Sequence, residues 1–360
     1  MDGNSPGGAL RIAMVSPLHE SVPPRMYGGT ERVVSFLTEE LVRMGHDVTL
    51  YATGDSVTTA ALRAMAPRGL RLDKSREPLA HHVAMVHDVV RDAGEFDVVH
   101  FNIDYVHFPA ARAARLRCAT TMHGRLDIPD LGAVYRRYPD MPLVSISDAQ
   151  REPLSWASWA ATVHHGLPLD LLRPGAGSGG YLAFLGRISP EKRPDRAIRI
   201  ARRAGMPLRI AAKVEAADHP YYAHEIRPMM DGGGIEFVGE INEREKQAFL
   251  GDAAALLFPI DWPEPFGLVM IEAMACGTPV IAYREGSVPE IIEDGVTGWI
   301  VEDEEGAVRA IGRLGGFDRA ACRARFEERF SAARMARDYV DVYRELLASS
   351  GEPLRMVASR

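Results

Sequence analysis

The sequence predicts an α/β protein with two doubly wound domains that face a cleft. Short apolar runs alternate with amphipathic stretches from Leu10 onward, which is typical of parallel strands covered by helices on both faces. The pattern occurs twice, and a segment rich in glycine and proline separates the two copies. A length of 360 residues is enough for two domains of ordinary size. Because ligands of such sheets bind beyond the carboxyl ends of the strands, we expect functional residues in the loops that follow strands.

The first half of the chain opens with a strand, a helix and a second strand. Leu37, Leu41 and Met44 recur at helical spacing, with Thr30 as the expected N-cap and Gly45 as the residue that ends the helix. This arrangement predicts a βαβ unit and therefore a parallel sheet. The strands expected in this half are Arg11 to Ser16, Val48 to Ala52, Asp97 to Phe101, Ala119 to Met122, Leu143 to Ser147 and Ala161 to His164.

The second half repeats the alternation of strands and helices. We interpret residues 167–180, which contain Pro168, Pro174 and several glycines, as an interdomain linker. Ser331 is expected to cap a last helix that starts at Ala332. The strands expected in this half are Tyr181 to Leu185, Leu208 to Ala212, Ile235 to Val238, Ala254 to Phe258, Pro279 to Ala282 and Gly298 to Val301.

These elements define the expected domain boundaries. Residues 1–9 are expected to be a disordered N-terminus, residues 10–166 the first domain and residues 181–330 the second domain. The helix over residues 331–349 can cross back to the first domain, and residues 350–360 form a tail.

Charge and cysteine content restrict the class of protein. A net charge of -7 argues against nucleic-acid binding through a broadly basic face, although a local basic pocket can still hold a phosphate. Cys118, Cys276 and Cys322 show neither disulfide nor zinc-ligand spacing, which fits a reducing compartment. No run approaches the roughly 18 apolar residues of a membrane-spanning helix, and the first residues do not resemble a signal peptide. We therefore expect a cytoplasmic protein.

Two loops have the composition of anion sites. Gly28 and Gly29 follow the first strand and precede a helix, so they permit close approach of a ligand to the N–H groups of the helix start. Arg187 and Lys192 follow the strand over residues 181–185, and a bidentate guanidinium beside an ammonium suits a diphosphate. A plain glycine turn and a solvated basic loop are the structural alternatives.

The richest stretch runs from residue 261 to residue 280. Glu264 lies in a proline-rich loop, and Glu272 lies in an otherwise apolar helix expected from about Gly267 to Cys276. A carboxylate in such a helix is costly to bury without a partner, and sugar hydroxyls would serve. The alternatives are a protein donor for Glu272 and a favourable helix-start position for Glu264.

The same stretch carries a family resemblance. Glu264 to Glu272, EPFGLVMIE, followed by AMACGTPVIA, resembles the Glu-x7-Glu signature of retaining nucleotide-sugar glycosyltransferases of family four, which have the GT-B architecture of two Rossmann-like domains. Other segments resemble motifs of the family in the same order, over about residues 10–345. They are YGGTERVVSFLTEELVRMGHDVTLYA, TMHG, GRISPEKRP, VPEII and GVTGWIV.

The resemblance implies a role for each matching residue. Glu272 would bind the ribose of the donor, and Glu264 would lie by the donor sugar. His123 would lie near the anomeric end and the 6-hydroxyl of that sugar, so Glu264 and His123 are the candidate catalytic residues. The residues implied for the rest of the donor are Arg187, Lys192, Gly28 and Gly29 for the diphosphate, and the N–H groups of Phe266, Gly267 and Leu268 for the sugar or the distal phosphate.

The implied activity is transfer of a hexose, with retention, from a nucleoside diphosphate sugar to an acceptor that the sequence does not identify. A UDP-sugar is favoured, and GDP-mannose is the other candidate donor. Because no Asp-x-Asp pair occurs, we expect no metal and no cofactor besides the nucleotide-sugar co-substrate, with Arg187, Lys192 and helix dipoles taking the charge of the leaving group. The alternatives are a nucleotide-sugar epimerase or hydrolase of related architecture, and a nucleotide-sugar-binding protein without catalysis.

The acceptor would be a small molecule, a glycan or a lipid-linked compound on the first domain. The loops expected near it are Leu18 to Tyr27, Thr53 to Thr59 and Asn102 to His107. A predicted helix carrying Arg112, Arg115 and Arg117 could touch anionic lipid headgroups, but a solvated basic helix is favoured because no exposed apolar stripe adjoins it.

One position departs from the family pattern beside the expected phosphate loop. The chain has Lys192-Arg193 where the family often has Lys-Gly. The extra cation could favour a more negatively charged donor or acceptor, although the favoured interpretation is an Arg193 that faces solvent.

Overall fold

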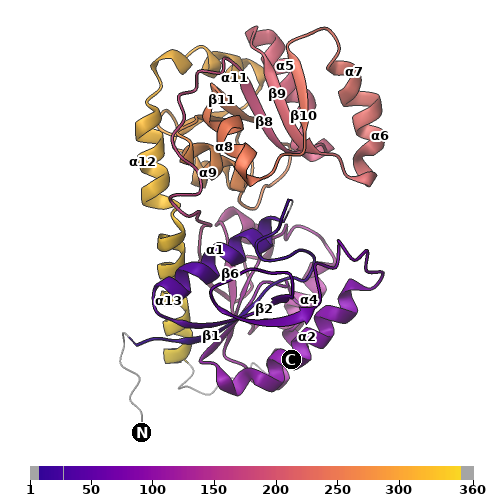
Figure 1. Ribbon diagram of the computed structural model, residues 1–360, viewed down its shortest axis with the longest axis vertical. Helices are drawn as coiled ribbons and strands as arrows, with labels where there is room; N and C mark the ends of the chain where they lie inside the picture. The colour runs from indigo at the N-terminus through magenta and orange to yellow at the C-terminus, as the bar shows by residue number, and fades with distance from the viewer. Residues whose placement is uncertain (1–7, 27, 350–360) are drawn as a thin grey trace. The chain divides into compact units, whose positions relative to one another are not determined.

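The computed structural model describes residues 8–26 and 28–349, and it divides into two compact units (Figure 1). The first unit holds the described residues up to Ile146, Pro153–His164 and the described residues from Ala332 onward. The second unit holds Ser147–Glu152 and His165–Ser331. The expectations for residues 1–7 and for the tail over residues 350–360 lie outside the described residues.

The first unit is built on a parallel sheet of seven strands. The strand order is β3-β2-β1-β4-β5-β6-β7, and every neighbouring pair is parallel. All carboxyl ends therefore lie at one edge of the sheet. The strand order reverses between β1 and β4, because successive strands are added on one side of β1 and then on the other. The strands are β1 Arg11–Val15, β2 Asp47–Thr53, β3 Ala61–Ala66, β4 Val98–Phe101, β5 Cys118–Thr121, β6 Leu143–Ser145 and β7 Trp159–Thr162.

Helices cover both faces of this sheet. One face packs against α2, α3 and α4 through apolar residues such as Val86, Phe108 and Tyr135. The side chains of His100 and Thr121 bond to α13, which lies beside α1. The bounds are α1 Gly29–Arg43, α2 Pro78–Asp92, η1 Ala93–Glu95, α3 Phe108–Ala113, α4 Leu131–Arg137 and α13 Ala332–Ser349.

Three local expectations for this unit were wrong. Strand β3 was not expected, because its residues favour helix and its side chains are mostly exposed at the edge of the sheet. Thr30 is not the N-cap of α1, since the helix begins at Gly29 and Gly28 occupies the cap position. Arg115 and Arg117 do not share a helix with Arg112, because α3 ends at Ala113.

The C-terminal helix α13 is tied to the first sheet by buried hydrogen bonds. His100 Nδ1 lies 2.7 Å from the Tyr343 hydroxyl, and His100 Nε2 lies 2.7 Å from Thr121 Oγ1. The Thr121 hydroxyl is in turn 2.8 Å from that of Tyr339. Burial lowers the pKa of His100 to about 3, so the ring is neutral near neutral pH and each nitrogen needs a partner.

The second unit is built on a parallel sheet of six strands. The strand order is β10-β9-β8-β11-β12-β13, and all neighbouring strands are parallel. The strand order therefore reverses between β8 and β11. The strands are β8 Leu182–Arg187, β9 Leu208–Lys213, β10 Ile235–Gly239, β11 Ala255–Phe258, β12 Val280–Tyr283 and β13 Gly298–Val301. Both sheets confirm the predicted α/β class.

Helices also cover both faces of the second sheet. Helices α5 and α11 pack together against one face, while α9 contacts α8 and α12 (Figure 1). The bounds are η3 Pro190–Lys192, α5 Pro194–Ala204, η4 Ala216–Asp218, α6 His219–Tyr221, the π-helical η5 Tyr222–Ile226, α7 Arg227–Met229, α8 Glu243–Gly251, α9 Leu268–Ala275, α10 Val288–Ile291, α11 Glu304–Ile311, η6 Leu314–Gly316 and α12 Arg319–Arg329.

The glycines before β8 pack closely against other segments of the second unit, to which they belong. Gly175 N donates to Cys276 O at 2.9 Å, and Gly177 N donates to Gly251 O at 2.9 Å. A Cβ atom at Gly175 would lie 2.2 Å from Gly251 O, which no side chain tolerates. These glycines therefore serve close backbone approach, and not chain flexibility alone.

In the described part of the chain, no helix is both long enough and apolar enough to cross a bilayer.

We expect Tyr343→Phe to lower the free energy of unfolding by about 1–3 kcal/mol, because it leaves a buried nitrogen of His100 without its partner. Urea unfolding followed by circular dichroism measures this. Tyr105→Phe is the control, since Tyr105 is 38% exposed and its loss of a hydroxyl should change little. Equal stabilities of the two variants would contradict a structural role for the Tyr343 hydroxyl.

Candidate functional site

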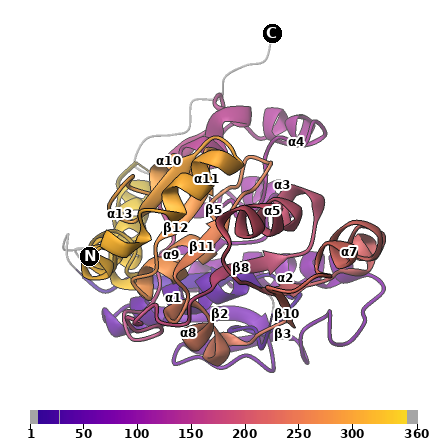
Figure 2. The same cartoon turned by 90° about the horizontal axis from the view of Figure 1, so that it is seen from above.

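The candidate site of the second unit lies where the strand order of its sheet reverses, between β8 and β11. The chain leaves β8 toward β9 on one side, and β11 pairs with β8 on the other (Figure 2). Loops that follow β8 and β11 diverge at such a point and leave room for a ligand. Arg187 ends β8, Lys192 ends the turn η3 that follows, and Glu264 lies in the loop after β11.

Lys192 and Glu264 form an ion pair between these two loops. Both side chains are mostly buried, with 19% and 11% of their surface exposed. The Lys192 ammonium also lies 4.7 Å from the centre of the Trp262 ring, within range of a cation–π interaction. The structure therefore brings together two predicted site residues that are 72 positions apart.

Arg187 is surrounded by carboxylates. Its guanidinium pairs with Glu191, lies 3.3 Å from Glu215 and lies 3.8 Å from Asp218. Glu191 lies in the turn η3 that follows β8, whereas Glu215 and Asp218 follow β9. An anion that binds Arg187 must therefore compete with these carboxylates.

The loop that carries Glu264 is anchored at three successive backbone carbonyls. Glu264 O accepts from Ser287 N at 3.0 Å, Pro265 O accepts from the Ser147 hydroxyl at 2.7 Å, and Phe266 O accepts from the Ser287 hydroxyl at 2.9 Å. Both serines are fully buried. Because these carbonyls are satisfied, the loop holds one conformation and fixes the position of the Glu264 carboxylate.

Gly286 permits this anchoring. It has a φ of 51°, and a Cβ atom there would lie 2.4 Å from Glu264 N and 2.5 Å from Glu264 O. The backbone of the β12–α10 loop thus approaches the Glu264 loop more closely than any side chain allows.

Helix α9 begins directly after this loop. Gly267 caps it with a φ of 77°, where a Cβ atom would lie 2.8 Å from a carbon of Met270. Phe266 is buried, and the centre of its ring lies 4.8 Å from the centre of the His165 ring. The first N–H groups of a helix lack partners within the helix, and the N-terminal end of its dipole favours an anion or a hydroxyl oxygen. The predicted N–H contacts of residues 266–268 remain a prediction.

Glu272 is buried in α9 and has a protein partner. It is 3% exposed, and its Oε1 accepts from Lys246 Nζ at 2.7 Å. The structure thus agrees with the alternative interpretation of the sequence, a protein donor for this acid. Lys246 lies on α8, and no motif in the sequence pointed to it.

Arg193 does not face solvent, so the favoured interpretation of this residue was wrong. It adopts the left-handed region with φ and ψ of 52°, which explains why glycine is common at this position of the family. Its guanidinium bonds Asp195 at 2.9 Å and Asp261 at 2.7 Å. Burial alone would raise the pKa of Asp195, but the guanidinium groups of Arg193 and Arg199 lower it to about 2. The extra cation is thus neutralised by two carboxylates.

The first unit carries the other predicted residues at the reversal point of its own sheet. Gly28 caps α1 with a φ of 151°, where a Cβ atom would lie 2.8 Å from Pro24, and the exposed Gly29 opens the helix. His123 follows β5, and Asn102 follows β4. The predicted neighbourhood of these residues with those of the second unit stays a prediction.

Asn102 sets the tautomer of His123. The Asn102 amide nitrogen donates to Val15 O at 3.2 Å, so its Oδ1 faces His123 Nε2 at 2.8 Å. An amide oxygen only accepts, so His123 carries its hydrogen on Nε2 and Nδ1 is the accepting nitrogen. Desolvation lowers the pKa of His123 to about 3, which keeps the ring neutral near neutral pH.

Sequence reasoning missed the residues that hold the site in place. Glu290 of the VPEII motif accepts from the backbone N–H groups of Asp148 and Ala149 at 2.7 Å, at the start of the 3-10 helix η2 Ala149–Leu154. Among these residues, Glu290 lies in a motif that resembles the family, and Asn102 begins a loop expected near the acceptor. The others are Ser147, Ser287, Gly286 and Lys246, and no local pattern distinguishes them from ordinary polar or glycine residues.

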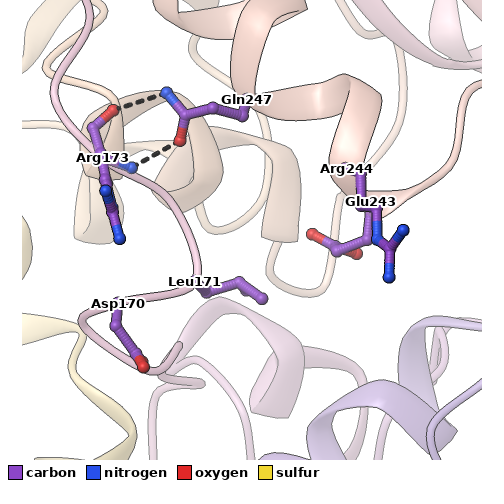
Figure 3. A pocket seen from close by; sticks show the side chains of 6 residues that line it. All are labelled: Asp170, Leu171, Arg173, Glu243, Arg244 and Gln247. Atoms are coloured by element: carbon purple, nitrogen blue, oxygen red, sulfur yellow. Dashed lines mark hydrogen bonds between the residues drawn. The ribbon is translucent and has the colours of Figure 1, made fainter.

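A pocket of about 350 Å³ lies elsewhere in the second unit (Figure 3). Its wall includes Arg173 and Gln247, which exchange hydrogen bonds of 2.6 and 3.0 Å between the Arg173 backbone and the Gln247 amide. No predicted site residue lines it. Over residues 8–26 and 28–349 no group of three or more His, Cys, Asp or Glu residues could hold a metal ion. The pocket is lined by Asp170, Leu171, Arg173, Glu243, Arg244 and Gln247.

Two family models match the chain, one in each half. The model described as Glycosyltransferase Family 4 matches residues 27–165, and the model described as Glycosyl transferases group 1 matches residues 176–314. The chain therefore belongs to glycosyltransferase family 4, which confirms the resemblance found in the sequence.

Individual relatives agree with this assignment. A D-inositol 3-phosphate glycosyltransferase from Mycobacterium leprae (strain Br4923) is 33% identical over a match that covers 38% of this chain and 36% of that protein. The match thus spans about a third of the length of this curated relative. The crystal structure of AviGT4, a glycosyltransferase involved in avilamycin A biosynthesis, is 25% identical with a TM-score of 0.73, over 94% of this chain and 98% of that one.

A third relative is more distant in sequence. Anabaena Alr3699/HepE, solved in complex with UDP and glucose, is 17% identical with a TM-score of 0.71. The match covers 94% of this chain and 100% of that chain. At this identity the likeness concerns the fold alone. Together these structures confirm the predicted GT-B fold with two Rossmann-like domains.

We expect Gly286→Ala to destabilise the protein by about 1–3 kcal/mol more than Gly295→Ala, because only the first substitution forces backbone apart. Both glycines have positive φ, of 51° and 79°, but nothing lies within 4 Å of a Cβ atom at Gly295. Denaturant unfolding of the two variants isolates the close approach from the cost of the backbone conformation. Similar losses for both variants would show that the loop yields easily.

Proposed function

We propose that the protein is a retaining glycosyltransferase that moves a hexose from a nucleoside diphosphate sugar to an acceptor without a metal ion. A UDP-sugar is the favoured donor, and GDP-mannose is the other candidate. Membership of family 4 supports sugar transfer from a nucleotide sugar. The solved complex of HepE with UDP and glucose makes UDP the first nucleotide to test.

The ion pair between Lys192 and Glu264 carries this proposal. The resemblance assigns Lys192 to the donor diphosphate and Glu264 to the donor sugar, and these two groups are covalently joined in a nucleotide sugar. Residues with those roles must lie next to each other at the phosphate–sugar junction. Their contact, at the reversal point of the sheet, is consistent with this requirement.

The leaving diphosphate would be stabilised by cations already in place. Lys192 would turn from Glu264 toward a phosphate oxygen, and Arg187 would exchange one of its carboxylates for the diphosphate. The N-terminal end of α9 adds the partial positive charge of its dipole. Once turned toward the diphosphate, these groups would stabilise the charge that develops as the glycosidic bond breaks.

The remaining predicted residues would act on the sugar and the nucleoside. Glu264 would lie by the sugar, where positive charge grows in the transition state, and Glu272 would accept hydrogen bonds from the ribose. His123 would accept a hydrogen bond from a sugar hydroxyl at Nδ1, the accepting nitrogen of its tautomer. Gly28 and Gly29 would permit close approach of the diphosphate.

The nucleotide is tested first by thermal melting in the presence of EDTA. We expect UDP to raise the melting temperature more than GDP, ADP or dTDP does, because a UDP-sugar is the favoured donor. A ligand at about 100 times its Kd adds roughly 2.7 kcal/mol to stability. A larger shift with GDP would move the donor to GDP-mannose. The transferase proposal fails if no nucleoside diphosphate shifts the melting temperature with or without magnesium.

The two glutamates are expected to fail in different ways. Glu272→Gln should weaken UDP binding roughly tenfold to hundredfold, because it removes a charge-assisted hydrogen bond to the ribose. Glu264→Gln should leave UDP affinity unchanged or slightly higher, because it releases Lys192, and its loss should appear in kcat with the full donor. Calorimetry with UDP and steady-state kinetics with the UDP-sugar separate the two effects.

Glu236→Gln is the matched control for these variants. Glu236 pairs with Arg209 on neighbouring strands of the same sheet, and both side chains are substantially exposed. This substitution should change neither UDP affinity nor kcat. The two roles are wrongly assigned if Glu264→Gln loses UDP affinity while Glu272→Gln keeps it.

A further inference from the structure

Lys246 is the one side chain, among residues 8–26 and 28–349, that hydrogen-bonds the Glu272 carboxylate. It lies in the first turns of α8, a helix whose start is fixed by a capping box between Asn242 and Glu245. Its side chain is 13% exposed and that of Glu272 is 5% exposed. A lysine this buried is uncommon, and its burial and its two carboxylate contacts restrict the ammonium.

The charges around Lys246 show what kind of ligand the pair suits. Its ammonium also lies 3.4 Å from Glu243 Oε2, so one cation faces two carboxylates. This cluster has a net negative charge and would repel a phosphate. Hydroxyl groups, which donate to carboxylate oxygens, are the complementary ligand chemistry. Lys246 is therefore unsuited to binding the diphosphate directly, in contrast to Lys192.

The geometry also leaves accepting capacity on Glu272. A carboxylate has two oxygens with about four lone-pair sites, and Lys246 uses one of them on Oε1. The ammonium holds the carboxylate in one orientation within an otherwise apolar helix. A fixed acceptor loses less entropy when it binds a diol than a mobile one does.

We propose that Lys246 is a positioning residue that orients Glu272 toward the ribose and thereby makes the site select ribonucleotides over 2′-deoxyribonucleotides. This inference rests on the proposed function, because it takes Glu272 as the ribose ligand. A 2′-deoxyribose lacks one of the two vicinal hydroxyls, so it gains less from a correctly oriented carboxylate. The preference for ribose therefore measures the orientation of Glu272.

A purely structural Lys246 predicts a different result. If the lysine only neutralised a buried acid, its loss would destabilise the fold and weaken all nucleotides by a similar factor. The ratio of the two affinities, for UDP and for 2′-deoxy-UDP, would then stay unchanged. This ratio separates positioning from charge neutralisation, whereas stability or overall affinity does not.

The experiment is calorimetric titration of the full chain with UDP and with 2′-deoxy-UDP. Wild type is expected to bind UDP on the order of tenfold more tightly than 2′-deoxy-UDP. Lys246→Met should reduce this preference to within about threefold, chiefly by loss of UDP affinity. Lys246→Arg keeps a cation that can reach the carboxylate, so it should retain most of the preference.

Two further variants guard against misfolding. Lys246→Met combined with Glu272→Gln leaves no unpaired charge at position 272, and it should lose the ribose preference to the same extent as either single variant. Arg334→Met removes an ion pair of the same 2.7 Å length in α13 of the first unit, with a cation of similar burial, 18% exposed, and a carboxylate that is 41% exposed. It should keep the full preference, whatever its effect on stability.

Each outcome decides between the two interpretations. An unchanged UDP to 2′-deoxy-UDP ratio in Lys246→Met, or in the double variant, would overturn the positioning role. A wild type that binds UDP without preferring ribose would overturn it as well, while leaving the proposed transferase function intact. If wild type binds GDP in place of UDP, the GDP and 2′-deoxy-GDP pair gives the same test. Failure to bind any of the four nucleotides would count against the proposed function itself.

Discussion

The need of buried carboxylates for a cation organises the candidate site. Glu264 and Glu272 are both buried, eight residues apart, and each is paired with one lysine. Lys192 comes from the turn after β8 and Lys246 from α8, so the two ion pairs tie these two segments to the Glu264 loop and to α9. Removing one member of such a pair leaves an uncompensated charge, which typically costs about 3–5 kcal/mol. The positions of these segments are therefore coupled through electrostatics.

The parallel sheet makes this coupling possible. All strands of the second unit end at the same edge, and the reversal between β8 and β11 separates their loops. The same topology recurs in the first unit, where Gly28, Asn102 and His123 follow strands β1, β4 and β5 around its reversal point. Each sheet thus presents polar groups at the place where its helices leave in opposite directions.

Backbone geometry accounts for residues that have no chemistry of their own. Gly286 lies against the Glu264 loop because only hydrogen fits there, and two serine hydroxyls satisfy the loop carbonyls. Arg193 shows the opposite solution. It accepts a left-handed conformation that costs about 1–2 kcal/mol, and its bonds to Asp195 and Asp261 offset that strain.

Periodicity and motif spacing in the sequence were enough to predict the α/β class, the central strands, the family and the carboxylates of interest. These features follow from local rules, since buried parallel strands are apolar runs and Glu264 and Glu272 lie in one continuous motif. Only the tertiary structure decided which lysine pairs with which glutamate, that Arg193 is neutralised, and that β3 extends the first sheet. Such partners are tens of residues apart in the chain, and their contact depends on which loops the strand order brings to the same edge of a sheet.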